Sequence, residues 1–467
     1  MCVHRPVCRC HVGVFISLFY AAVVLVPSTP SPSPLSSQQI VELAQNNDKR
    51  VQIIREQLSI LEAKQQEARW AWFPKFESTF AVAGPVPEAK NNGLGGPPTT
   101  QASYLYDWDW GTVGISLRAS MSTVLPVYTF GKLSAVREMA AHAVGLGHTL
   151  ECKAKEEIRL QALQAYWGFQ IASKAKASLQ EGQKRLDEVE RLLVQLEKAG
   201  SLQVSRADFF KLKYYRNLLE SRQGEVEAGQ KFALAALEAM VGAPVSLVEE
   251  EIPEPWAKLP SVEESLDLAL GARVELRTLE EGVGLRKAEV GLAQSQFWPD
   301  IGIVGFARWA WASNTTRQYS AFAYDPFHES SAGIGLMVRM TFDIPQKVAR
   351  FRQAQGELRK VQREREAAQT GLKMELAKLL GEMQGIQVRA RSLEASEREA
   401  RRWATAAMAA FELGTGESRD VFDAYFAWLS ASSEKLRAWS EFQLGLAALE
   451  RAVGTKLSTA DALSDDE

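Results

Sequence analysis

The sequence predicts a mainly α-helical protein with a small β part, built from two copies of one unit that each contain a long helical hairpin. Three observations lead to this prediction. Short motifs return in the same order in the two halves of the chain. The stretches 132–198 and 347–413 contain no proline and repeat apolar residues at heptad-like intervals. Shorter stretches alternate apolar and polar side chains, which is the pattern of a strand with two different faces.

The overall composition is that of an ordinary soluble protein. Hydrophobic residues make up 46% of the chain and charged residues 24%, and the net charge is -3. This charge argues against a nucleic-acid partner, because proteins that bind nucleic acids usually present a basic surface. The only long apolar run is 12–26, so hydropathy predicts no membrane-spanning helix after it.

Residues 1–35 are expected to be a signal peptide for export. Arg5 and Arg9 give a positive start, the apolar run 12–26 follows, and 27–34 is rich in proline and serine. A membrane anchor is the alternative, and it is disfavoured because the apolar run is short for a bilayer-spanning helix.

The mature chain is expected to be an internal duplication. The tripeptide Trp72–Pro74 returns in similar form as Phe297–Pro299, and the segment 236–242 returns as 448–454. The chain then divides into a first repeat at 36–250, a linker with three prolines at 251–260, a second repeat at 261–457 and an acidic tail at 458–467.

Each repeat is expected to begin with a helix and continue with two strands. The helix at 37–70 has apolar residues at a spacing of three or four. Pro74 ends it, because the residue before a proline disfavours helical backbone, and Pro299 has the same place in the second repeat. Strands are expected at about 76–82 and 113–128, and at about 301–311 and 334–344.

A helix of unusual length follows in each repeat, at 132–198 and at 347–413. At about 1.5 Å per residue, each would extend roughly 100 Å, and its heptad-like pattern predicts coiled-coil packing. Turns at Gly200 and at Gly414 and Gly416 lead into return helices at 205–241 and 418–453. Each repeat therefore has a helical hairpin at one end and a β-hairpin at the other.

The strands need a partner surface. A two-stranded hairpin is marginally stable alone, and open strand edges invite pairing. Most of the 12 tryptophans lie in or beside the strand regions, as in the aromatic girdles of membrane barrels. A soluble, aromatic-rich β-layer is the alternative, but the export signal and the length of the helices favour a membrane barrel shared by several chains.

This order of elements resembles the TolC-like outer membrane efflux protein family, also called outer membrane factors. The resemblance rests on the tripeptides 72–74 and 297–299 before the strands, on the strand-to-helix junctions 126–132 and 342–347, and on the hairpin-tip segment 411–424. It covers nearly all of the mature chain.

The resemblance implies a homotrimer in the outer membrane of a Gram-negative bacterium, with a long periplasmic portion. Four strands from each chain would close a twelve-stranded β-barrel, surrounded by outer-membrane lipid, and the helical hairpins would form an α-barrel across the periplasm. Such a duct exports small molecules or proteins, as the exit of a tripartite efflux pump or of a type I secretion system. Its partners would be a periplasmic adaptor (membrane fusion) protein and an inner-membrane transporter. The alternative is a soluble periplasmic coiled-coil scaffold or adaptor protein.

The resemblance also places a periplasmic aperture at the hairpin tips. Asp208, Asp420 and Asp423 fall on positions where three chains would form rings of carboxylates, as in cation-selective pores. The alternative is that they are carboxylates at helix starts, stabilised by the helix dipole.

The tip departs from the family pattern at two positions. Phe411 and Gly416 stand where the best known gate has a tyrosine and an arginine, and neither can replace the hydroxyl or the charge. We expect Arg206 and Arg419, which lie next to acidic positions, to substitute.

The sequence contains no pattern that predicts an enzyme. There is no glycine-rich phosphate loop before a helix and no nucleophile–base motif. His142 and His148 are spaced to lie on different sides of a helix, so they are not expected to share a metal. We therefore expect no catalytic residue, no metal site and no cofactor.

Overall fold

The computed structural model describes residues 34–88, 109–199, 204–247, 250–315, 317, 325 and 327–457. The expected signal peptide (except its last two residues), the turn residue Gly200 and the acidic tail 458–467 lie outside the described residues. Among the helices that are described, none combines the length and the apolar character needed to cross a bilayer.

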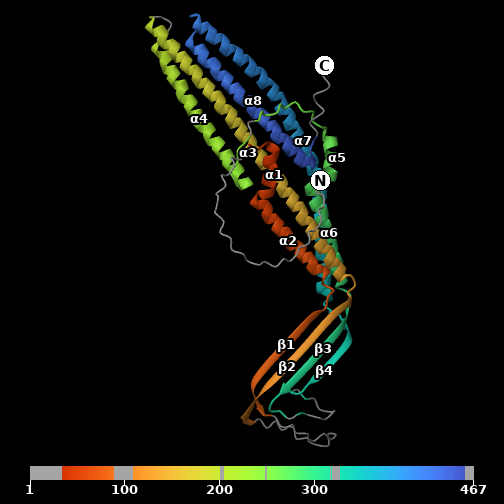
Figure 1. The fold of residues 1–467 in the computed structure, drawn as a ribbon. Helices are drawn as coiled ribbons and strands as arrows, with labels where there is room; N and C mark the ends of the chain where they lie inside the picture. Colours follow the sequence, from red (N-terminus) through yellow and green to blue (C-terminus); the bar gives the residue numbers. More distant parts are fainter. Residues whose placement is uncertain are drawn as a thin grey trace, which may run out of the picture.

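The two repeats have the same element order, and together they form one elongated molecule with a sheet at one end and helical hairpins at the other (Figure 1). The first repeat contains α1 (Ser37–Asn47), α2 (Lys49–Arg69), β1 (Lys75–Glu88), β2 (Asp109–Tyr128), α3 (Lys132–Lys198) and α4 (Arg206–Val241). The second contains α5 (Val262–Ala272), α6 (Val274–Ser295), β3 (Asp300–Ala312), β4 (Ser330–Arg339), α7 (Ile344–Glu412) and α8 (Ser418–Val453).

The prediction of one helix over 37–70 is wrong, because α1 and α2 are separated at Asp48. The N–H of Asp48 bonds to the carbonyl oxygen of Ala44 at 3.0 Å and closes α1. Its side chain then accepts from the N–H of Arg50 at 2.8 Å and opens α2. One residue thus caps two helices. Arg273 separates α5 from α6 in the same place, without a capping side chain.

The predicted strand at 334–344 is displaced, because β4 ends at Arg339 and α7 begins at Ile344. Pro345 lies in the first turn of α7, where its missing N–H and fixed φ fit a helix start. The alternation of Met340, Phe342 and Ile344 therefore continues past the last strand residue without forming strand.

The four strands form one antiparallel sheet in the order β1-β2-β3-β4, with the two repeats joined between β2 and β3. The register places most of the large apolar side chains of the strands on one face, whereas Val124, Val304, Phe306 and Met337 lie on the other. The apolar face carries Phe76, Phe80, Val82, Ile115, Leu117, Met121, Ile303, Trp309, Trp311, Ile334, Leu336 and Val338. The other face carries mainly small and polar residues. The apolar face is uncovered, with Ile334 85% and Leu336 74% exposed.

The helices pack through three buried apolar clusters. One lies among α1, α3 and α4, and a second among α5, α7 and α8. The third lies at the hairpin tips and joins both repeats; we call it the tip cluster, and it contains Leu186, Val189, Leu193, Leu212, Leu219, Phe411, Val421 and Phe422. The heptad-like pattern of α3 is confirmed here, since Val189 is 1% and Leu193 0% exposed.

Candidate functional site at the hairpin tips

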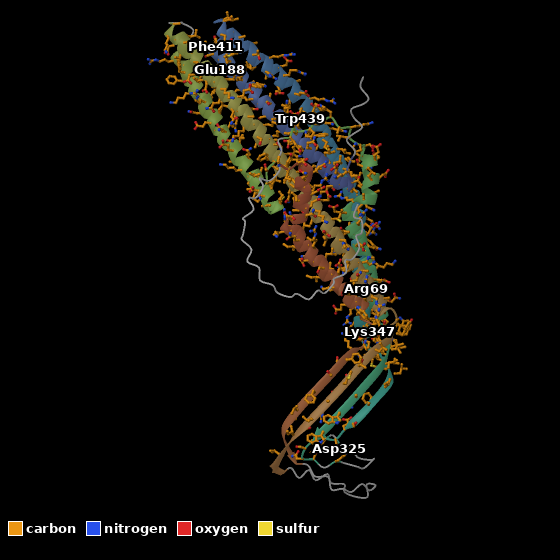
Figure 2. All side chains as sticks on the ribbon, in the orientation of Figure 1. Arg69, Glu188, Asp325, Lys347, Phe411 and Trp439 are labelled. Carbon is orange, nitrogen blue, oxygen red and sulfur yellow. The ribbon has the colours of Figure 1, made fainter. Side chains whose placement is uncertain are left out.

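The tips of the two helical hairpins lie together at the end of the molecule farthest from the sheet (Figures 1 and 2). The tip cluster holds α3, α4, α7 and α8 together at this end. Aromatic rings extend it, because Tyr215 of α4 lies 5.2 Å from Phe422 and 4.6 Å from Phe426 of α8, measured between ring centroids. The side chains predicted for the aperture therefore lie beside a well-packed apolar and aromatic cluster.

Asp208 connects the starts of the two return helices. One carboxylate oxygen accepts from the N–H of Ser205 at 2.8 Å and from its hydroxyl at 3.0 Å, which caps α4. The other accepts from the hydroxyl of Ser418, at the start of α8, at 2.6 Å. Burial raises the pKa of Asp208, but the hydrogen bonds from Ser418 and Ser205 outweigh it, and the net pKa lies below its ordinary value.

Asp423 makes the second connection between the repeats. The hydroxyl of Tyr215 donates to Asp423 Oδ1 at 2.8 Å, and Arg419 Nε lies 3.5 Å from the other carboxylate oxygen. Burial, together with the hydrogen bond to Asp423, raises the pKa of Tyr215 to about 12. Tyr215 was missed in the sequence, although it stands between Leu212 and Leu219 at the spacing of three and four that marks the buried side of a helix.

Asp420 differs from the other two carboxylates. It is exposed in the first turn of α8, and no side-chain hydrogen bond or ion pair joins it to another described residue. Asp208 and Asp423 each bind a side chain of the opposite repeat. The three predicted aperture carboxylates therefore divide into two that connect the hairpins and one that is open to solvent.

The predicted gate residues Phe411, Arg206 and Arg419 occupy three different environments. Phe411 is 4% exposed and packs within the tip cluster, so it is not presented at the surface of this chain. Arg419 reaches the carboxylate of Asp423, whereas Arg206 is exposed and pairs with no carboxylate in the part of the chain that the structure describes.

The turn between α7 and α8 requires its glycines. Gly414 has φ +72°, which favours glycine. A Cβ at Gly416 would lie 2.9 Å from the Cβ of Ala410 and 3.0 Å from the N of Phe411, so an arginine at this position would force the turn to move. The missing gate arginine therefore follows from the close packing of this turn.

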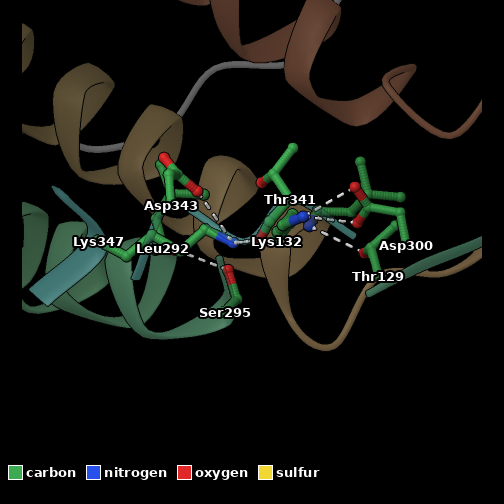
Figure 3. Close-up of polar contacts among 9 residues, drawn as sticks. Thr129, Lys132, Leu292, Ser295, Asp300, Thr341, Asp343 and Lys347 are labelled. Carbon is green, nitrogen blue, oxygen red and sulfur yellow. Dashed lines mark hydrogen bonds and ion pairs between the residues drawn. The ribbon is translucent and has the colours of Figure 1, made fainter. Parts of the chain in front are cut away.

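The predicted Pro74 and Pro299 directly precede β1 and β3. Two lysines fix the same junction between helices and strands (Figure 3). Lys132 Nζ, at the start of α3, lies 2.7 and 2.8 Å from the carboxylate oxygens of Asp300, the first residue of β3. Lys347, at the start of α7, is 3% exposed. Its Nζ donates to the carbonyl oxygen of Thr341 and lies 3.4 Å from Asp343 Oδ1. The first pair ties one repeat to the other, and the second stays within its repeat.

No group of acidic, histidine or cysteine side chains suited to a metal ion occurs among the described residues. His142 on α3 instead contacts Glu281 on α6, with Nδ1 2.8 Å from a carboxylate oxygen. The expectation of no metal, cofactor or catalytic residue stays a prediction.

Comparison with known proteins identifies relatives of this chain. Residues 265–455 match the family described as Outer membrane efflux protein. The alkaline protease secretion protein AprF of Pseudomonas aeruginosa is 23% identical over 369 residues, which cover 76% of this chain and 73% of AprF.

Solved structures share the fold over both repeats. The outer-membrane channel OprN superposes with a TM-score of 0.72 at 18% identity, covering 90% of this chain and 89% of OprN. The open state of the MtrE outer-membrane channel of Neisseria gonorrhoeae has a TM-score of 0.69 at 16% identity, covering 90% of this chain and 89% of MtrE. The outer membrane protein VceC of Vibrio cholerae has a TM-score of 0.68 at 15% identity, covering 90% of this chain and 96% of VceC.

These findings confirm the resemblance to the TolC-like outer membrane efflux proteins and the predicted fold class. The family match, which lies within the second repeat, also confirms the predicted outer-membrane location and the predicted function as an export channel. The family and the structural relatives are channels rather than enzymes.

Proposed function

We propose that three copies of this chain form the exit duct of an efflux pump or a type I secretion system. The observation that carries the proposal is the sheet. Its apolar face is exposed, and β1 and β4 each pair on one side only among the described residues. Such a sheet aggregates in water. Its backbone groups are hydrogen-bonded and its apolar side chains are removed from water when the edges pair with neighbouring chains and the apolar face contacts lipid.

The polar face of the sheet then lines the water-filled interior. Ser120 and Ser122 of β2, Arg308 of β3 and Ser331 of β4 lie on this face. The alternation of lipid-facing apolar and lumen-facing polar residues is that of an outer-membrane barrel. A soluble adaptor protein would leave the apolar face in water, which argues against the alternative.

The helical hairpins continue the duct into the periplasm. The 67 residues of α3 extend roughly 100 Å, a length suited to crossing a compartment. We propose that the tips meet an inner-membrane transporter held by a periplasmic adaptor. AprF is named for the secretion of a protease, which supports protein export, whereas the family description supports efflux.

At the tips, we assign separate tasks to the carboxylates. Three copies of Asp420 would form a ring at the aperture and favour cations, since this side chain is exposed and has no partner among the described residues. The Asp208–Ser418 and Tyr215–Asp423 bonds hold the two hairpins of one chain together and resist widening of the aperture. Arg419 balances the charge of Asp423.

Fractionation tests this function directly. The full chain, expressed with residues 1–35, should be recovered in the outer membrane and should run on an unboiled gel at about three times the mass of the boiled chain. Recovery of a monomer in the soluble periplasmic fraction would contradict the proposed duct.

A further inference from the structure

The two repeats allow an internal comparison at the junction between helices and sheet. In the first repeat Arg69 and Trp70 precede Trp72–Pro74, and in the second Gln294 and Ser295 stand at the matching positions before Phe297–Pro299. Trp70 is 61% exposed, whereas Ser295 is 3% exposed and donates to the carbonyl oxygen of Leu292. The first repeat therefore presents a cation and an indole where the second has an exposed, neutral glutamine and a buried serine.

The first junction carries an exposed aromatic group that continues the apolar face of the sheet. Trp70 stacks on Trp72 with ring centroids 6.1 Å apart and an interplanar angle of 23°. Phe73 lies edge-on to both, and its centroid is 6.4 Å from that of Phe76. Phe76 belongs to the apolar face by its register with Thr123. The aromatic group thus lies at the helix-side rim of the surface that meets lipid, where Trp and Tyr belts mark the headgroup level.

Two arginines lie directly beyond this aromatic group. Arg137 of α3 donates to the carbonyl oxygen of Arg69 at 3.3 Å, that is, to the peptide that leads into Trp70. The Arg69 guanidinium donates to Gln65 at 3.0 Å, and Figure 2 labels Arg69 at the end of the helical part that adjoins the sheet. Both side chains are exposed, and neither pairs with a carboxylate among the described residues.

We propose that Arg69 and Arg137, together with the Trp70–Trp72 stack, bind the phosphate of an anionic phospholipid headgroup in the periplasmic leaflet of the outer membrane. Guanidinium groups bind phosphate by charge-assisted hydrogen bonds, and aromatic rings hold the glycerol region beside them. This inference rests on the proposed barrel, which sets the level of the membrane.

Two lysines near the sheet are not available for this headgroup. Lys75 pairs in register with Val124 and lies on the polar face, away from lipid. Lys132 is bound to both carboxylate oxygens of Asp300. In the second repeat Arg352 stands at the position matching Arg137, but Gln294 and the buried Ser295 replace the second cation and the indole. Within the part of the chain that the structure describes, the site therefore occurs once.

Native mass spectrometry of the delipidated full-length trimer tests the site, with phosphatidylglycerol or phosphatidylcholine as the added lipid. Wild type should bind phosphatidylglycerol in preference, up to one per chain. Arg69→Gln, which installs the residue of the second repeat, combined with Arg137→Gln should weaken that binding roughly thirtyfold. Arg352→Gln is the matched control and should leave it unchanged, and Arg69→Lys should retain most of it.

Four outcomes would overturn the inference. The first three are equal binding of the two lipids by wild type, unchanged binding by the double variant, and displacement of the lipid by inorganic phosphate at equal concentration. The fourth is wild-type lipid affinity in a trimer whose neighbouring chain buries Arg69. The unboiled gel separates these results from a failure of the proposed function, because without a trimer there is no duct, whereas a trimer without lipid preference contradicts only the site.

Discussion

Replacing Tyr215 by phenylalanine removes one hydroxyl from the hairpin tips and leaves the ring in place against Phe422 and Phe426. The lost bond is the one to Asp423 at 2.8 Å. A hydrogen bond to a charged group contributes about 1.5–3 kcal/mol. The lower end applies, because the Asp423 side chain is 42% exposed to water and keeps Arg419 at 3.5 Å. We therefore expect the closed tip to lose about 1.5 kcal/mol.

This loss should appear as a change in gating. About 1.5 kcal/mol corresponds to roughly a tenfold rise in the ratio of open to closed channels, measured as open probability in planar bilayers. The control is Tyr214→Phe, which removes the same hydroxyl from the neighbouring residue, 61% exposed, and should change nothing. Equal behaviour of the two variants would refute the role of the Tyr215–Asp423 bond.

The same bond has a predictable dependence on pH. The neutral phenol is the donor, and its pKa is raised from an ordinary value of about 10 to about 12 in the folded tip. The stabilisation is therefore fully present below about pH 10 and is lost as the pH rises through about 12. Open probability of wild type should stay constant from neutral pH to about pH 10, and an earlier rise would show that Tyr215 does not hold the tip closed.

Three further predictions concern the tip and the packing of α3 on α6. Asp420→Lys should lower cation selectivity, measured as the reversal potential in a salt gradient, and an unchanged potential would remove Asp420 from the aperture ring. The pKa of Asp208 is lowered in the folded tip, so its contribution is present above an unfolded pKa of about 3.9 and lost as the pH falls through the folded value; channel openings in bilayers should increase only in that acidic range. Gly284→Ala would place a Cβ 2.3 Å from the ring of His142 and should lower the free energy of unfolding by about 1–3 kcal/mol. The control is Gly291→Ala, whose Cβ meets nothing within 4 Å and which should be neutral or stabilising. Equal melting temperatures for the two alanine variants would contradict the close packing described at His142.

The elements that sequence predicts well are those whose pattern is local and uninterrupted. The structure has α3 at Lys132–Lys198, the predicted range, because a proline-free heptad-like pattern determines both its length and its buried side. The break at Asp48 was missed because it depends on a single residue. The N–H of Asp48 closes α1, and its side chain caps the start of α2. The end of β4 was misplaced because Met340, Phe342 and Ile344 continue the alternation beyond the paired residues.

The tip was predictable only in part. The positions of Asp208, Asp420 and Asp423 came from resemblance, and no local pattern distinguishes their environments. The partners Ser418 and Tyr215 lie on the opposite repeat, 210 and 208 residues away in the chain. Such pairs arise from the packing of one hairpin against the other. The periodicity of a single helix does not reveal which residues of another helix it will contact. For the same reason Phe411 was assigned to the aperture, although it fills the tip cluster.

Thiol labelling of the two faces of β4 tests the central claim most directly. In a Cys152→Ser background, single cysteines replace Ile334, Leu336 or the intervening Gly335, at which a Cβ meets nothing within 4 Å. In intact outer membranes a water-soluble maleimide should label Gly335→Cys, on the polar face, and should leave Ile334→Cys and Leu336→Cys unlabelled in lipid. Ile334 and Leu336 are 85% and 74% exposed in the single chain, so rapid labelling of both would show that this face lies in water and would contradict the barrel.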